Sequence, residues 1–366
     1  MSETPEISQP PTRQEGTDQR PVLMVDWLGR GGIAHCTQAW VEELRRAGKR
    51  VNLVTRYGRE LAASVPGTYG AGRHGGRLLQ HLALVAKSQR LVRSLAPPVL
   101  VLHGTVMPQA EIAVLHAAQR AGATVVLVAH EPAPPHAVPG SRSAFVHLVR
   151  TADIVVVHSR YVADRLRVHT GRSEFTLLPL PMQVGLIRSA TDAVSVIAPS
   201  PAPLALLFGN LHRGYKGLRV LEEVAATGAN GWCFALVGKG SPASLAGAVT
   251  VPRFLEAAEL VATVASSAVT LFPYERASQS GAVVLSQALG SVVVASAVGG
   301  IPEQVKDGFT GRLMPPRAGV EAWREVLKEL SDPKERARLS QLARISVESS
   351  HADFVAGVMA LIPGSM

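Results

Sequence analysis

The first candidate for chemistry is a basic loop at positions 208–218, FGNLHRGYKGL. Its two cations, Arg213 and Lys216, stand beside glycines that let the backbone turn sharply. The planar fork of an arginine and the point charge of a lysine both suit a diphosphate, and such charges stabilise a leaving group on which negative charge builds. We therefore predict that both residues are catalytic, and the alternative is a solvated basic loop without a ligand.

A second candidate anion site lies in the segment FPYERASQSGAV. Either serine of the SQSG stretch can cap the helix that follows, and the first amides of that helix have no helical partner. The free amides of Ser280 to Val283 would then form an anion site. Glu303, in the later turn GGIPE, either balances the dipole of its own helix or accepts a hydrogen bond from a sugar hydroxyl.

A glycine loop, DWLGRGGIAH, follows the first apolar run of the chain. Gly31 and Gly32 let the backbone approach a sugar phosphate at the start of a helix, which is a favourable place for an anion. Gly29, Gly31 and Ala34 also fit the GxGxxA dinucleotide fingerprint, and Arg56 would suit the 2′-phosphate of NADP. A tight turn without a ligand is the third interpretation.

His130 and Glu131 come directly after the apolar run TVVLVA and precede several prolines. Such a histidine either donates to a substrate hydroxyl or phosphate or has a structural role. A metal site that includes His136 is less favoured, because the prolines remove regular ligand spacing. Cys36 and Cys233 are far apart in sequence and form no CxxC site. We expect no metal ion and no cofactor.

Short apolar runs alternate with amphipathic stretches, which is typical of parallel strands crossed by helices. Strands are expected at 22–25, 51–54, 99–103, 124–129, 154–157, 176–178, 204–208, 233–237, 268–272, 292–296 and 312–314. Helices of the second half are expected at 218–226, 254–266, 281–289 and 318–330, with two more between 333 and 362. Open parallel sheets bind ligands at the carboxyl ends of their strands, and the candidate segments follow predicted strands.

The length of 366 residues favours two domains, and a proline-rich stretch lies between them. We predict an α/β protein in which two Rossmann-like parallel-sheet domains face each other across a cleft. The expected parts are a disordered tail at 1–20, an N-terminal Rossmann-like domain at 21–180, a linker at 181–203, a C-terminal Rossmann-like domain at 204–335, and C-terminal helices at 336–366.

The composition excludes several classes of protein. Hydrophobic residues make up 47% of the chain, which argues against global disorder, yet no apolar run approaches the ~20 residues of a membrane span. The N-terminus lacks a signal-peptide pattern, so we expect a cytoplasmic protein. A net charge of +9 favours anionic partners and is compatible with peripheral contact at the inner membrane face. Because the cations are dispersed and aromatic residues are only 5%, we expect no nucleic-acid partner.

The run from Phe272 to Pro316 resembles the donor-binding half of glycosyltransferase family 4, which has the GT-B fold. It is most similar to the branch with a Tyr…Ser-Gln-Ser-Gly stretch. The loop FGNLHRGYKGL resembles the FG…R…YKGL loop of that branch, and VDWLGRGGIAHCTQAWVEEL resembles its N-terminal glycine loop. VVLVAHEPAPPH and TADIVVVHSRYVADRL are similar to its histidine loop and the segment after it. The resemblance covers about residues 22 to 330.

The resemblance implies a retaining transfer from a nucleotide-sugar without a bound metal. It implies diphosphate contacts for Arg213 and Lys216, a place beside the anomeric carbon for His130, and phosphate contacts from the opposite domain for Gly31 and Gly32. The amides of Gln279, Ser280 and Gly281 would face the same phosphates or the sugar. We therefore predict a catalytic role for His130 as well, and donor-binding roles for these amides, for the two glycines and for Glu303. The family's final helix packs back on the N-terminal domain, which would be the role of the segment near His351–Ile362.

Two positions depart from the family pattern. Many members carry two glutamates, one on the sugar and one on the ribose, where this chain has Ala277 and Leu285. We predict a hexosyltransferase-like enzyme that moves a sugar from a nucleotide-diphosphate sugar to an acceptor hydroxyl on a glycan, a lipid-linked acceptor or a small molecule. The alternatives are an NADP-dependent Rossmann oxidoreductase and an inactive protein that binds a sugar nucleotide or carbohydrate.

Overall fold

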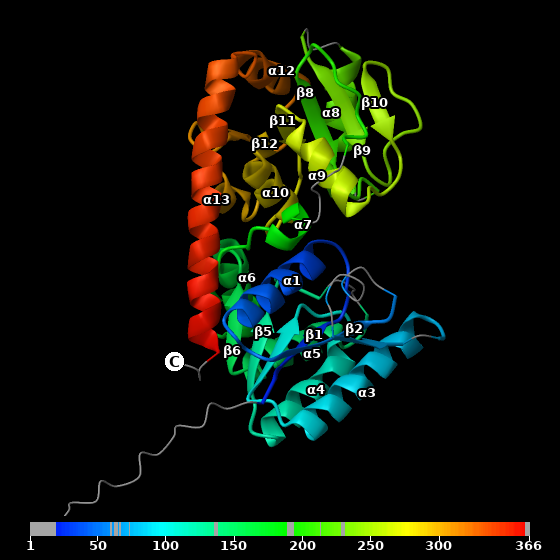
Figure 1. Ribbon diagram of the computed structural model, residues 1–366, viewed down its shortest axis with the longest axis vertical. Coiled ribbons are helices and arrows are strands. Elements are labelled where there is room, and N and C mark those ends of the chain that lie inside the picture. The colour runs from blue at the N-terminus through cyan, green and yellow to red at the C-terminus, as the bar shows by residue number, and fades with distance from the viewer. Residues whose placement is uncertain are drawn as a thin grey trace, which may run out of the picture.

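The computed structural model describes residues 20–58, 61, 65, 67–72, 74–134, 138–188, 194–212, 214–227 and 231–362. The tail expected at 1–20 lies outside these residues, apart from Arg20. Two parallel sheets with crossover helices form two domains, one above the other in Figure 1. The predicted α/β architecture with two Rossmann-like domains is confirmed.

The first sheet has seven strands in the order β3-β2-β1-β4-β5-β6-β7, and every neighbouring pair is parallel. The strands are β1 (Val22–Asp26), β2 (Val51–Arg56), β3 (Thr68–Ala71), β4 (Val99–His103), β5 (Thr124–Val128), β6 (Ile154–Val157) and β7 (Thr176–Leu177). β3 was not predicted, because its sequence TYGA is a half-exposed edge strand without an apolar run.

Helices cover both faces of this sheet because successive strand side chains point to opposite sides. In β1, Val22 and Met24 enter one core cluster, while Leu23 and Val25 enter the other. The helices of this domain are α1 (Gly31–Arg46), α3 (Arg77–Leu95), α4 (Pro108–Arg120), α5 (Ser141–Thr151) and α6 (Arg160–Thr170). None of the described helices is long and apolar enough to cross a membrane.

The second sheet has six strands in the order β10-β9-β8-β11-β12-β13. They are β8 (Leu204–Phe208), β9 (Cys233–Val237), β10 (Ala248–Val251), β11 (Val269–Phe272), β12 (Val292–Ser296) and β13 (Arg312–Met314). The helical segments are η1 (Gly214–Lys216), α8 (Leu218–Ala226), α9 (Ala257–Ala265), α10 (Gly281–Leu289), α11 (Ile301–Gln304) and α12 (Val320–Glu329). β10 was not predicted, because it lies at the sheet edge and its partly buried sequence lacks a continuous apolar run.

The segment between the sheets contains a short helix, α7 (Val184–Arg188), which lies against both α1 and α9. Its Leu186 is buried in the core cluster of the second domain. The stretch predicted as a linker therefore packs on both domains where the structure describes it.

The C-terminal segment is one helix, α13 (Pro333–Leu361), and the prediction of two helices there was wrong. Asp332 caps its start by accepting from Lys334 N at 2.9 Å, and no proline interrupts the helix after Pro333. The helix runs along both domains (Figure 1). Leu339 enters the core of the second domain, and Phe354 enters that of the first, where its ring packs edge-on against Trp40 at 5.9 Å.

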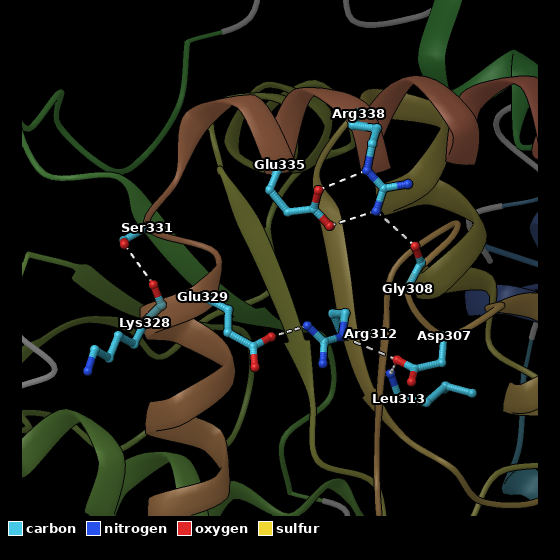
Figure 2. A network of polar contacts seen from close by, with 9 residues as sticks. All are labelled: Asp307, Gly308, Arg312, Leu313, Lys328, Glu329, Ser331, Glu335 and Arg338. Atoms are coloured by element: carbon cyan, nitrogen blue, oxygen red, sulfur yellow. Dashed lines mark hydrogen bonds and ion pairs between the residues drawn. The ribbon is translucent and has the colours of Figure 1, made fainter.

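Polar contacts tie α12 and α13 to the turn that precedes β13 (Figure 2). Arg312 pairs with Asp307 and Glu329, and Arg338 makes a two-pronged contact with Glu335. Arg338 also donates to the carbonyl oxygen of Gly308 at 2.9 Å. Because these groups are largely exposed, each pair is worth only about 0–1 kcal/mol. Their main effect is to fix the turn that follows α11.

Phe354→Ala should lower the free energy of unfolding of the first domain by about 3–5 kcal/mol, because a fully buried ring is removed at the contact between α13 and α1. Denaturant unfolding followed by tryptophan fluorescence checks this. Ile345→Ala is the control on the same helix, because Ile345 is 55% exposed, and its effect should stay within about 0.5 kcal/mol. Equal effects of the two variants would contradict the docking of α13.

Candidate functional site

The predicted site residues cluster where the strand order of each sheet reverses. The reversals lie between β1 and β4 and between β8 and β11, and such points in open parallel sheets form the crevice in which ligands bind. The glycine loop follows β1, and the loops that contain Lys216 and Ser280 follow β8 and β11. His130 follows β5, the neighbour of β4.

Lys216 is held against Tyr274 of the neighbouring loop. Its Nζ donates to the Tyr274 hydroxyl at 2.5 Å and lies 3.8 Å from the centre of the ring. The same phenol hydrogen-bonds the side chain of Ser280, and burial raises its pKa, so it stays neutral. An ammonium has three donors, so the contact with Tyr274 positions Lys216 near the start of α10 without neutralising its charge.

The two loops of the second domain pack closely because of Gly217. Its φ of +67° is in the left-handed region, and an added Cβ would collide with the carbonyl oxygen of Pro273. Glu275 N donates to the carbonyl oxygen of Tyr215 at 2.8 Å, and the guanidinium of Arg276 lies 5.4 Å from the Tyr215 ring centre. The loop that carries Lys216 is therefore braced against the loop that leads into α10.

The start of α10 is only partly available to a ligand. The hydroxyl of Ser280 accepts from Val283 N at 3.4 Å, as expected of a helix cap. The amide of Ser280 itself donates to Gln304 Oε1 at 2.8 Å, and Gln304 Nε2 returns a bond to the Ser280 carbonyl. Of the three amides predicted to face phosphates, that of Ser280 is thus engaged by Gln304. The amide of Gly281, in the first turn, has no intrahelical partner.

Hydrogen bonds join this region directly to the first domain. Gln279 Nε2 donates to the carbonyl oxygen of His130 at 2.8 Å, and the hydroxyl of Ser278 donates to Glu131 at 2.5 Å. The carbonyl oxygen of Gly281 accepts from Gln183 Nε2 at 2.9 Å. The structure thus brings His130, Gln279 and Gly281, which are up to 151 positions apart, into one interface.

Glu303 reaches the first domain from α11. Its two carboxylate oxygens accept from the amides of Arg160 and Tyr161 at 2.7 and 3.0 Å, at the start of α6. Ser159, the cap of that helix, donates its hydroxyl to the carbonyl oxygen of Ser278 at 3.0 Å. Glu303 therefore balances the dipole of a helix in the other domain and not that of its own helix, and its donor-binding role stays a prediction.

The glycine loop after β1 is supported by Asp26. One carboxylate oxygen accepts from the amides of Leu28 and Gly29 at 2.8 and 2.7 Å, and the other accepts from the hydroxyl of Thr37. Gly31 and Gly32 are exposed, and a Cβ added to either would meet no described atom within 4 Å. The described part of the chain therefore leaves space beside Gly31 and Gly32 at the start of α1.

His130 belongs to a row of buried histidines at the carboxyl edge of the first sheet. Its ring centre lies 6.0 Å from that of His103 and 5.0 Å from that of His158. Burial, together with the charge of neighbouring histidines, lowers the pKa of His130 well below 6.5 and that of His103 to about 3, and burial lowers that of His158 to about 4. At neutral pH these rings are uncharged, so His130 offers one donor and one acceptor and no cation.

Other residues singled out from the sequence are either outside the described part of the chain or at least partly buried. Arg213 and His136 are outside the described residues. Arg56, considered for the 2′-phosphate of NADP, is 7% exposed. Leu285, one of the two departures from the family pattern, is buried in the core of the second domain, while Ala277 is half-buried at the edge of that core.

Sequence reasoning missed four polar residues of this region: Tyr274, Gln304, His103 and His158. Two of them had a visible signal, because the apolar runs VLVLH and VVVH end in a histidine just as VVLVAH does. Gln304 had none, since its contact with Ser280 depends on how α11 folds back toward α10. Tyr274 was part of the family motif but carried no predicted role.

The comparison with protein families gives a match in the second domain. Residues 202–332 match the family of glycosyl transferases group 1. This match covers the second domain, including the loop of Lys216, the start of α10 and Glu303. No curated protein matches the chain in sequence.

Solved structures are similar over nearly the whole chain. Sucrose-phosphate synthase from Thermosynechococcus elongatus has a TM-score of 0.70 and 18% identity, covering 93% of this chain and 97% of that one. Anabaena HepE in complex with UDP and glucose has a TM-score of 0.72 and 18% identity, covering 93% and 98%. WaaG, a glycosyltransferase involved in lipopolysaccharide biosynthesis, has a TM-score of 0.65 and 14% identity, covering 94% and 100%. These similarities confirm the GT-B fold.

Glu303→Gln should loosen the contact between the domains, because hydrogen bonds to a charged acceptor contribute about 1.5–3 kcal/mol and the amide offers only one acceptor oxygen. We expect a lower Tm and a larger radius of gyration in small-angle X-ray scattering of the ligand-free protein. Asp353→Asn, at an exposed position of α13, is the matched control and should change neither quantity. An unchanged radius of gyration combined with weaker donor binding would make Glu303 a sugar contact instead.

Proposed function

We propose that this protein is a glycosyltransferase that moves a sugar from a nucleotide-diphosphate sugar to an acceptor hydroxyl with retention of anomeric configuration. The observation that carries the proposal is the match of residues 202–332 to glycosyl transferases group 1, in the domain that holds Lys216 beside the start of α10. A fold alone does not fix a reaction, so the argument rests on this site.

The donor diphosphate is assigned to the second domain. Lys216 supplies a positive charge, and the first turn of α10 supplies backbone amides and the positive end of a helix dipole. Both groups stabilise the charge that builds on the nucleoside diphosphate as it leaves. Arg213, three residues before Lys216, is assigned to the same phosphates from the sequence motif.

The sugar and the acceptor are assigned to the edge of the first domain. His130 is a neutral hydrogen-bond partner for the sugar beside the anomeric carbon, and the open backbone at Gly31 and Gly32 borders the phosphate from the opposite side. An added Cβ at Gly104 would lie 3.5 Å from Ile33 and 3.6 Å from His130, so the start of α1 adjoins the histidine. The acceptor hydroxyl enters between these elements.

No protein nucleophile is assigned to the reaction. Three carboxylates on the facing edges have structural partners: Asp26 holds the glycine loop, Glu131 accepts from Ser278, and Glu303 caps α6. Because each has a structural partner, none is placed as one of the two opposed carboxylates that a glycosidase uses. The acceptor hydroxyl therefore attacks directly, and water is excluded by the contact between the domains.

A second candidate is an inactive protein that binds a sugar nucleotide. It is favoured by Ala277 and by Leu285, which is 2% exposed and belongs to the core cluster, because neither side chain can accept a hydrogen bond from a sugar or ribose hydroxyl. Thermal shift with a panel of UDP- and GDP-sugars, followed by measurement of nucleoside diphosphate release, separates the two. A donor that raises Tm but releases no diphosphate with any acceptor supports the binding protein.

Lys216→Ala should lower the transfer rate by about 10²-fold or more, because a positive charge is removed from the departing diphosphate. The rate of nucleoside diphosphate release at saturating donor measures this. Lys328→Ala, at an exposed position on α12, is the control and should retain the full rate. Wild-type turnover in the Lys216 variant would remove this role.

We further propose that α3 makes peripheral contact with an anionic membrane, which would present a lipid-linked acceptor. The helix carries Arg77, Lys87, Arg90 and Arg93 and contains no acidic residue. Three of its leucines are exposed: Leu78 by 54%, Leu79 by 62% and Leu82 by 42%. Exposed leucines beside basic residues are the pattern of a helix that lies in a membrane surface.

Replacing Leu78 and Leu79 with serine should reduce co-sedimentation with vesicles that contain phosphatidylglycerol, because the apolar part of the contact is lost. Val168→Ser, at a position 83% exposed on α6, is the control and should sediment as the wild type does. Equal sedimentation of the wild type and the double variant at physiological salt would exclude α3 as the membrane contact.

A further inference from the structure

A cysteine and three histidines gather at the proposed sugar site, and one of them is His130, whose imidazole has one ring nitrogen for an ion and a second one for the sugar. β4, β5 and β6 are neighbours in the sheet, and each leads into a histidine, at positions 103, 130 and 158. Cys36 of α1 faces this row, with its Sγ 3.5 Å from His158 Nε2. Ligand atoms of Cys36, His103 and His130 all lie within 4.8 Å of one another.

The ring nitrogens of this cluster are poorly satisfied. Within the part of the chain that the structure describes, neither ring nitrogen of His103 has a hydrogen-bond partner, and neither does Nε2 of His130. Their side chains belong to residues that are 1% and 5% exposed. An unpartnered polar group in such a position costs about 1–3 kcal/mol, so the folded chain keeps these nitrogens together at a loss of stability.

The hydrogen bonds of His158 fix which of its two ring nitrogens carries the proton. Its Nδ1 lies 3.0 Å from the carbonyl oxygen of Leu178, which can only accept, so Nδ1 carries the proton and Nε2 keeps a lone pair. Nε2 therefore accepts the hydrogen bond of the Cys36 thiol. A backbone carbonyl that fixes the far side of an imidazole is a common outer contact of metal sites.

We propose that Cys36, His103 and His130, with His158 beside them, bind a thiophilic divalent cation such as Zn²⁺. A thiolate and neutral imidazoles are ligands that Zn²⁺ prefers, and the ligand atoms of a tetrahedral site lie roughly 3.5 Å apart. Side-chain rotations that bring the atoms of the 4.8 Å cluster about 1 Å closer supply three of the four positions and leave the fourth to water. The Cys36 S–H bond breaks as the S–metal bond forms, and the proton passes to solvent by way of His158 Nε2. One proton is released for each ion bound.

The protonation states favour this role. Burial keeps the three imidazoles neutral at pH 7, so their lone pairs are available to an ion.

The test is a titration of the full-length protein, purified without a polyhistidine tag and treated with chelator, with Co²⁺ as a spectroscopic substitute for Zn²⁺. We expect one equivalent of Co²⁺ to produce a cobalt–thiolate charge-transfer band and the intense visible bands of a tetrahedral ion, both abolished by excess Zn²⁺. Absence of the charge-transfer band from the wild-type protein overturns the proposal.

Variants assign the ligands. Cys36→Ser should abolish the charge-transfer band, whereas Cys233→Ser, which changes the other cysteine, should retain it. His158→Asn should weaken binding about 10–100-fold, as expected for an outer partner. His116→Ala removes an exposed histidine pair, in which the Nε2 atoms of His116 and His147 are 3.2 Å apart, and should leave the band unchanged. A band that survives Cys36→Ser or disappears with Cys233→Ser overturns the assignment, and because the readout is optical it does not depend on transferase activity.

Discussion

The relative position of the two domains depends on a helix that is buried at both ends. α13 places Leu339 in the core of the second domain and Phe354 in the core of the first, so neither domain can rotate far without exposing apolar surface. α7 adds a second bridge, since it lies against a helix of each domain. With these two elements in place, the carboxyl edges of both sheets are held close enough for short polar side chains to connect them.

Hydrogen bonds connect those edges directly. Ser278 and Gln279 meet the His130–Glu131 loop, and Glu303 meets the start of α6. Such contacts can be broken and remade at modest free energy, because water replaces each partner when the domains separate. An interface of this kind suits a protein whose ligand has to enter between two domains that then close over it.

The sequence predicted the fold well because its parallel strands are continuous apolar runs that end in polar loops. Edge strands such as β3 and β10 lacked that signal, and α13 was divided in prediction although no proline or glycine separates its two halves. The loops of the candidate site were chosen from the sequence, and the structure brings Lys216 and Ser280 together through Tyr274, while the roles of these residues stay predictions. Contacts across the domains, such as that of Glu303 with α6, depend on tertiary placement that no local pattern encodes.

The carboxylate of Glu303 also affects which helix starts can attract an anion. Helices α1, α6 and α10 begin on the facing edges, and each would attract negative charge by its dipole. At α6 the chain supplies its own anion from the opposite domain, so that amino terminus is already occupied. In the proposed reaction the phosphate is therefore assigned to the starts of α1 and α10, whose dipoles would orient it within the gap.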